Sequence, residues 1–70
     1  MNRDAALKLD ALLLGIRYSL DYAQRYMKPH LSEEDYKKYK YAMARSAGEL
    51  IDIANDLYKK FPDIFPDELK

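Results

Sequence analysis

The stretch Leu31–Phe61, with the sequence LSEEDYKKYKYAMARSAGELIDIANDLYKKF, decides the fold. Ser32 suits the N-cap of a helix, because its hydroxyl can accept a hydrogen bond from an unpaired amide of the first turn. Pro62 ends a helix, since its ring removes the backbone donor. Between these signals apolar residues recur at steps of three and four, which predicts one amphipathic helix over about residues 33–60. Its apolar stripe contains Tyr36, Tyr39, Met43, Ala47, Leu50, Ala54, Leu57 and Phe61.

A second helix is expected before this stretch. Asn2 can cap a helix that begins at the next residue. Pro29 disfavours helical angles at the residue before it, so this helix ends there. We therefore expect a helix over about residues 3–27 and a turn over residues 28–31. So short a connection between two long helices predicts an all-α fold, an antiparallel two-helix hairpin.

Residues 61–70 contain the triplet Phe-Pro-Asp twice. Two prolines in so short a segment prevent a regular continuation of the helix. We expect a short C-terminal tail whose Ile64 and Phe65 fold back over the helix ends. The chain is then a single helical-hairpin domain over residues 1–70.

The predicted helix over residues 3–27 has two apolar stripes, whereas a surface helix usually has one. At about 100° per residue the stripes lie on nearly opposite sides. We expect the Leu9/Ile16/Leu20 stripe to pack on the second helix. The other stripe then meets either a second copy, giving an antiparallel four-helix dimer, or a different protein. The first stripe contains Ala5, Leu9, Leu12, Ile16, Leu20, Ala23 and Met27, and the second contains Leu7, Ala11, Leu14, Tyr18 and Tyr22.

Composition excludes several classes of function. The chain has no cysteine and one histidine, so disulfides, thiolate zinc sites and histidine clusters are excluded. No nucleophile with an adjacent base is evident, and we expect neither an enzyme nor a cofactor. No apolar run approaches the roughly 18 residues of a membrane span, and the N-terminus lacks a signal-peptide pattern. We expect a cytoplasmic protein.

Tyrosine is the dominant aromatic residue, with seven copies against two phenylalanines and no tryptophan. Tyrosine and arginine are enriched among the residues that dominate protein interfaces. Several of each lie toward the predicted turn, which indicates a protein-recognition surface. The candidate partner-binding residues are Leu14, Arg17, Tyr18, Tyr22, Arg25, Tyr39, Tyr41 and Arg45.

The basic run Lys37-Lys38-Lys40 supports an alternative function, direct nucleic-acid binding through phosphate contacts. Against it, twelve Lys and Arg balance twelve Asp and Glu, whereas nucleic-acid binders usually carry a basic footprint. The acidic run Glu33-Glu34-Asp35 also lies one helical turn away. We therefore expect a protein partner in preference to a nucleic acid.

Three motifs of the second half are Leu31-Ser32-Glu33-Glu34, Glu49-Leu50 and Leu57-Tyr58-Lys59-Lys60-Phe61-Pro62. Together with the length of the chain, they resemble the Hha/YmoA family of small helical bacterial proteins. Members of that family bind the nucleoid protein H-NS and alter gene expression without being strong DNA binders. The resemblance implies a protein partner that regulates transcription.

In size, hairpin layout and tyrosine-rich faces the chain is also similar to small phage proteins that bind and disable host regulators, such as quorum-sensing anti-activators. Both resemblances imply action through another protein. We therefore predict a non-enzymatic, dimeric protein-binding module that modulates or inhibits a regulatory protein, above all a transcription regulator.

Overall fold

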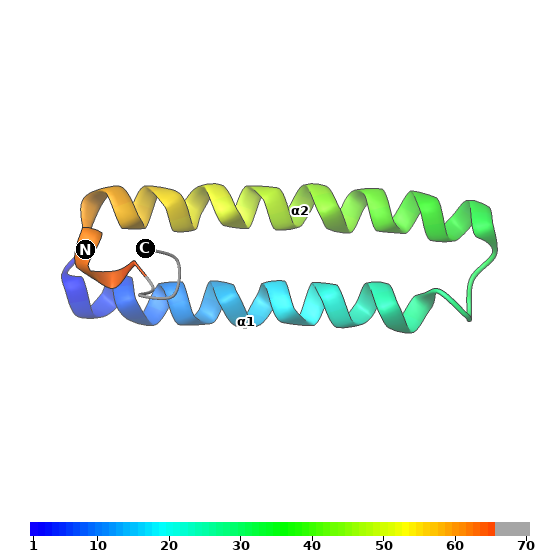
Figure 1. The fold of residues 1–70 in the computed structure, drawn as a ribbon, viewed down its shortest axis with the longest axis horizontal. Helices are drawn as coiled ribbons and strands as arrows, with labels where there is room; N and C mark the ends of the chain where they lie inside the picture. The colour runs from blue at the N-terminus through cyan, green and yellow to red at the C-terminus, as the bar shows by residue number, and fades with distance from the viewer. Residues whose placement is uncertain (66–70) are drawn as a thin grey trace.

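The computed structural model describes residues 1–65 as two long antiparallel helices followed by a short turn (Figure 1). Helix α1 spans Arg3–Met27, helix α2 spans Glu33–Lys60, and the 3-10 turn η1 spans Pro62–Ile64. The all-α hairpin and the bounds of both helices are confirmed. The part of the predicted tail over residues 66–70 lies outside the described residues.

Local signals set the helix ends. The Asn2 side chain accepts a hydrogen bond from the Ala5 amide at 2.8 Å, and the Ser32 hydroxyl accepts one from the Asp35 amide at 3.2 Å. Each bond satisfies one of the amides that a helix N-terminus leaves unpaired. At the end of α1 the amide of Leu31 donates to the Met27 carbonyl at 3.1 Å, which closes the helix before the chain turns.

The tail folds back over the ends of the helices, as predicted. Ile64 is buried, and the Phe65 ring meets the Tyr58 ring edge-on with centroids 5.0 Å apart. Arg3 and Asp63 form an ion pair that joins the start of α1 to η1. The described ends of the chain therefore close the hairpin at the end opposite its turn (Figure 1).

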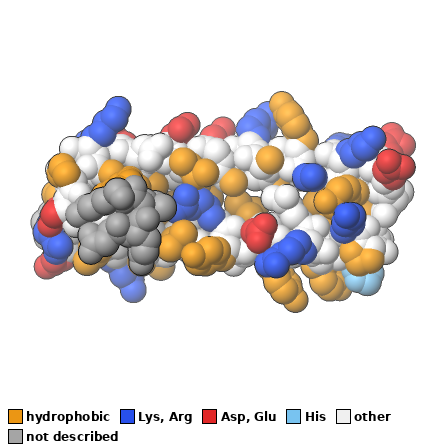
Figure 2. Space-filling view, in the orientation of Figure 1, with side chains coloured by type: hydrophobic (Ala, Val, Ile, Leu, Met, Phe, Trp, Pro, Cys, Tyr) orange, Lys and Arg blue, Asp and Glu red, His pale blue; other side chains and the backbone are white. Residues whose placement is uncertain are grey.

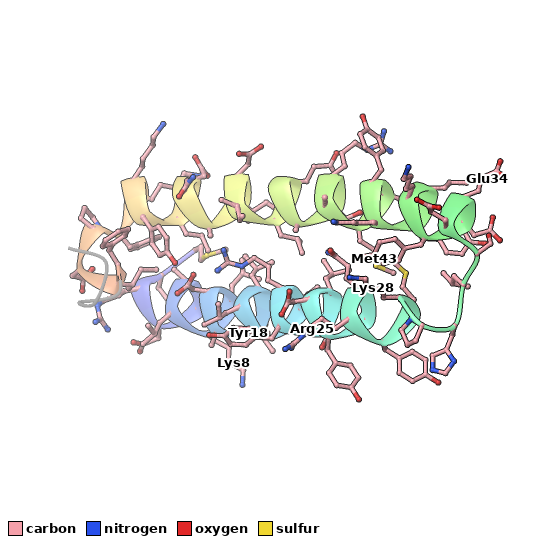
Figure 3. All side chains as sticks on the ribbon, turned by 45° about the vertical axis from the view of Figure 1, so that its right-hand side comes forward. Lys8, Tyr18, Arg25, Lys28, Glu34 and Met43 are labelled. Atoms are coloured by element: carbon pink, nitrogen blue, oxygen red, sulfur yellow. The ribbon has the colours of Figure 1, made fainter. Side chains whose placement is uncertain are left out.

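The core lies mainly at this closed end. Four buried residues form its centre, and four half-buried neighbours pack against them. Toward the turn the packing is thinner, with Met27 buried and Met43 pointing between the helices (Figure 3). The central residues are Ala6, Leu13, Leu57 and Ile64, and their neighbours are Leu9, Leu50, Tyr58 and Phe61.

The face of α1 that packs on α2 differs from the predicted one. Leu9 and Leu20 are half-buried as expected, but Ile16 is 47% exposed. The inner face is centred on Leu13, which belongs to neither predicted stripe and is 6% exposed. The prediction missed this face because it also carries polar residues. Asp10, Arg17 and Gln24 lie there, all half-buried, so a count of apolar residues placed this face among the solvent-exposed positions.

The predicted stripe of α2 does face α1, with one exception. Ala54 and Leu57 are buried, and most other stripe residues are half-buried. Tyr39 is 44% exposed and lies at the edge of the stripe. No helix of the described part is both long and apolar enough to cross a membrane.

Candidate protein-binding surface

A hairpin of two helices leaves two broad faces open, and the Tyr58–Asp10 hydrogen bond tells them apart. The Tyr58 hydroxyl donates to Asp10 Oδ1 at 2.7 Å, so these two side chains lie on the same face. At about 100° per residue, Asp10 is rotated from Leu13 in one direction, while Leu12 and Ile16 are rotated in the other. We call the face with Asp10 and Tyr58 the polar face.

The opposite face carries no charged side chain along its middle. Ala5, Leu9, Leu12, Ile16, Leu20 and Ala23 of α1 lie there by the same rotation, and on α2 Tyr39, Ala42, Ser46, Leu50 and Ile53 do so. We call these residues the apolar face. Three of its large side chains are strongly exposed although they are aliphatic: Leu12 by 52%, Ile16 by 47% and Ile53 by 45%.

The polar face is organised around Tyr58. Burial and the hydrogen bond to Asp10 raise the pKa of Tyr58 above its usual value, while the nearby charge of Arg17 acts in the opposite direction. Arg17 is half-buried, and its Nε has no hydrogen-bond partner among the described residues. Figure 2 shows this face, where basic and acidic side chains lie among hydrophobic ones over the junction between the helices.

Three tyrosines form a ridge on the side of α1 that points away from α2. Tyr18, Tyr22 and Tyr26 are 67%, 66% and 61% exposed. A shallow pocket between them is lined by Tyr22, Arg25 and Tyr26. The Arg25 Nη2 lies 3.2 Å from Asp21 Oδ2, one helical turn before it, which holds the guanidinium beside the tyrosines. We call Tyr18, Tyr22, Tyr26 and Arg25 the tyrosine ridge.

The other predicted partner-binding residues do not join this ridge. Tyr41, 70% exposed, lies on the far side of α2, and the exposed Arg45 lies between that side and the edge beside the apolar face. Tyr39 is on the apolar face, and Leu14 is 38% exposed at the edge of the polar face. The eight candidates are thus divided among several sides of the hairpin, and one flat partner cannot touch them all.

The basic run is also divided. Lys37 and Lys40 line a pocket near the turn, together with Lys28, Leu31, Glu33 and Tyr36. Lys38 is rotated by about 100° from Lys37 and lies on another side of the helix. Within the pocket Lys37 Nζ is 3.7 Å from Glu33 Oε1, and Lys40 Nζ is 5.7 Å from the centroid of the Tyr36 ring.

Within residues 1–65 no group of three histidine or acidic side chains is placed to hold a metal ion. No protein-family model matches the chain, and no characterised protein or solved structure gave a match. The surfaces of the hairpin are therefore what can indicate its function. The residues proposed from the sequence include Tyr18, Tyr22 and Arg25 of the ridge but not Tyr26. The apolar face was missed, because Leu12 and Ile16 were assigned to the interior of the hairpin.

Proposed function

We propose that this protein is a small, non-enzymatic binding module that acts as a dimer and docks onto a regulatory protein. Its cytoplasmic location and its effect on that partner's activity are part of the same proposal. The observation that carries it is the tyrosine ridge, where three tyrosines more than 60% exposed follow one side of α1 and two of them line a shallow pocket with Arg25.

The composition of the ridge favours a protein partner. Tyrosine adds large apolar area together with a hydroxyl that can bond in either direction, and it loses little conformational freedom on binding. The ridge lies on one helix, so its side chains are held at fixed spacing before the partner arrives. Such pre-ordering reduces the entropy cost of association.

The class of partner follows from the sequence resemblance to the Hha/YmoA family, whose members act on a regulator of transcription. The balance of twelve basic and twelve acidic residues supports a protein target over a nucleic acid. Lys37 already has a carboxylate partner in Glu33, and Lys38 lies away from the pocket that Lys37 and Lys40 share.

The test is affinity capture from nuclease-treated host lysate with the wild-type chain and two variants of equal helix content. Tyr18→Ala/Tyr22→Ala removes the centre of the ridge, and Tyr41→Ala removes an equally exposed tyrosine on the far side of α2. We expect one dominant protein that the double variant loses and Tyr41→Ala retains. Truncating central interface tyrosines costs about 2 kcal/mol each, or roughly a thirtyfold loss of affinity.

Equal capture by all three proteins would contradict the role of the ridge, and no specific protein at all would contradict the function. A signal that appears only when nucleic acid is left intact, and that weakens steeply with salt, would support the nucleic-acid alternative through Lys37 and Lys40.

A further inference from the structure

The apolar face is large enough to form a specific protein interface. The hairpin measures 44 × 21 × 16 Å along its principal axes, so each broad face spans about 900 Å². A stable interface buries about 800 Å² on each partner. Covering this one face would therefore bury as much area as a typical specific complex.

The edge of α2 beside the apolar face carries charges in an ordered pattern. Around Ala47 six of these charges form three pairs of opposite sign, each pair at equal distances along the helix, while Asp52 on the same side stands opposite the uncharged Ala42. Arg45 and Glu49 lie two residues on either side of Ala47, Lys38 and Asp56 nine residues, and Glu34 and Lys60 thirteen. All six are exposed, and we call them the charged edge.

A pattern that changes sign about its own centre is complementary to itself when one copy is turned end for end. Two α2 helices running antiparallel would place Lys38 beside the partner's Asp56 and Arg45 beside the partner's Glu49. Glu34 would lie beside the partner's Lys60, which is already 3.0 Å from Asp56 within its own chain. Opposite charges flanking an apolar seam select both partner and orientation.

We propose that the occupant of the apolar face is a second copy of this chain, packed so that α2 lies antiparallel on the partner's α2. The two-fold axis passes close to the level of Ala47. This inference rests on the dimeric part of the proposed function and specifies the face, the orientation and the register.

The same axis also brings matching surfaces of α1 together. Ala6 and Leu57 share one core cluster, so residue 47 of α2 is level with about residue 16 of α1. Ile16 of each copy then meets its equivalent near the axis, and Leu12 meets the region of the partner's Leu20 and Ala23. Apolar side chains contact apolar side chains along the whole helix.

The other face-to-face arrangement, with α2 on the partner's α1, lacks this match. It would set the charged edge against the edge of α1 near Gly15, Ser19 and Tyr26, which carry no charge. Lys8 alone would find an acidic neighbour there. Figure 3 shows Lys8 reaching away from α2, on the outer side of α1. The charge pattern therefore selects the α2-on-α2 arrangement.

The test uses Lys38→Glu and Asp56→Lys, measured separately and mixed by sedimentation equilibrium. Each variant alone sets like charges against each other at both symmetric contacts, and we expect about a tenfold weaker dimer. An equimolar mixture restores both contacts and should dimerise with near wild-type affinity. Lys38 and Asp56 are eighteen residues apart on one helix, so this rescue cannot arise within a chain.

The matched control is Lys37→Glu, which makes the same change of charge one residue away on the polar side of α2. Alone, it should dimerise like wild type, because its contacts between Lys38 and the partner's Asp56 are intact. Mixed with Asp56→Lys, it forms a heterodimer in which one contact still sets Lys38 against the substituted lysine, so this heterodimer should be weaker than that of Lys38→Glu with Asp56→Lys. A monomeric wild-type chain at all concentrations would overturn the proposal, and so would rescue by Lys37→Glu equal to rescue by Lys38→Glu. Capture of a protein partner through the tyrosine ridge is measured in a separate experiment. Failure of the dimer proposal would therefore not contradict the proposed protein-binding function.

Discussion

At the scale of single residues, the polar contacts of Tyr58 explain why charged side chains lie on the inner side of α1. The hydroxyl of Tyr58 donates to Asp10, and Arg17 lies close enough to influence its ionisation. A half-buried carboxylate without a donor would lose solvation without compensation. The contact agrees with the rotation of α1 that buries Ala6 and Leu13, since both place Asp10 toward α2.

We expect Tyr58→Phe to lower the free energy of unfolding by about 1 kcal/mol, because Asp10 loses its donor while remaining half-buried. The effect should depend on pH. The pKa of Tyr58 is raised above its usual 10.0, so its stabilising contribution is complete below about pH 10 and is lost as the pH rises through the folded-state value.

Urea unfolding of wild type and Tyr58→Phe between pH 7 and pH 11 measures both effects. The difference between the two proteins should shrink at the alkaline end. A difference that stays constant, or grows with pH, would contradict the assigned contact.

At the scale of elements, the helix ends were predictable and the packing face was not. The effects of Asn2, Ser32 and Pro62 on helix ends involve only residues a few positions away in the sequence. These effects can therefore be recognised without knowing the tertiary structure. The orientation of α1 involves a hydrogen bond between residues 48 apart in the chain, and periodicity does not reveal such a contact. Leu13 lies between the two apolar stripes, which is why neither stripe predicted it.

Among the candidate site residues, Tyr18 and Tyr22 could be grouped from the sequence because they lie four residues apart on one helix; Tyr26 continues this spacing but was not among the candidates. Their separation from Tyr41 and Arg45 was not predictable, since that requires knowing which side of α2 faces α1. The sequence analysis grouped these tyrosines and arginines because all lie near the turn in the sequence, but in the structure they lie on different sides of the hairpin.

The observed face of α1 predicts different results for two adjacent leucines. Leu13→Ala should lower the free energy of unfolding by about 2–4 kcal/mol, because it opens a cavity in the core. Leu14→Ala should cost less than about 1 kcal/mol, because its side chain is 38% exposed. Chemical denaturation of both variants compares them directly. Equal losses would mean that α1 is rotated away from the described face.

At the scale of the whole molecule, the hairpin buries little. Six residues of the described chain are buried, two of them alanines, and no large side chain there is less than 2% exposed. A chain this short rarely obtains more than about 3–5 kcal/mol from its own core. In the proposed dimer, association would add to the stability that helix packing gives a chain without cysteine.

We therefore expect the melting temperature to rise with protein concentration, by a few degrees for each tenfold increase. Ile16→Glu, which places a charge on the apolar face, should abolish this dependence while leaving the helix content of the concentrated protein similar. Circular dichroism across a hundredfold range of concentration measures both. A melting temperature that is the same at every concentration would contradict the expectation.

The outward direction of the tyrosine ridge has a consequence for avidity. In the proposed dimer α1 lies on the partner's α1, so both ridges face the same way as one two-fold platform. A target that is itself a symmetric dimer would meet two identical contacts at once, and the second contact would form at a high effective concentration. Two contacts that are weak singly would then hold such a target for much longer than either alone, whereas a monomeric target would gain nothing.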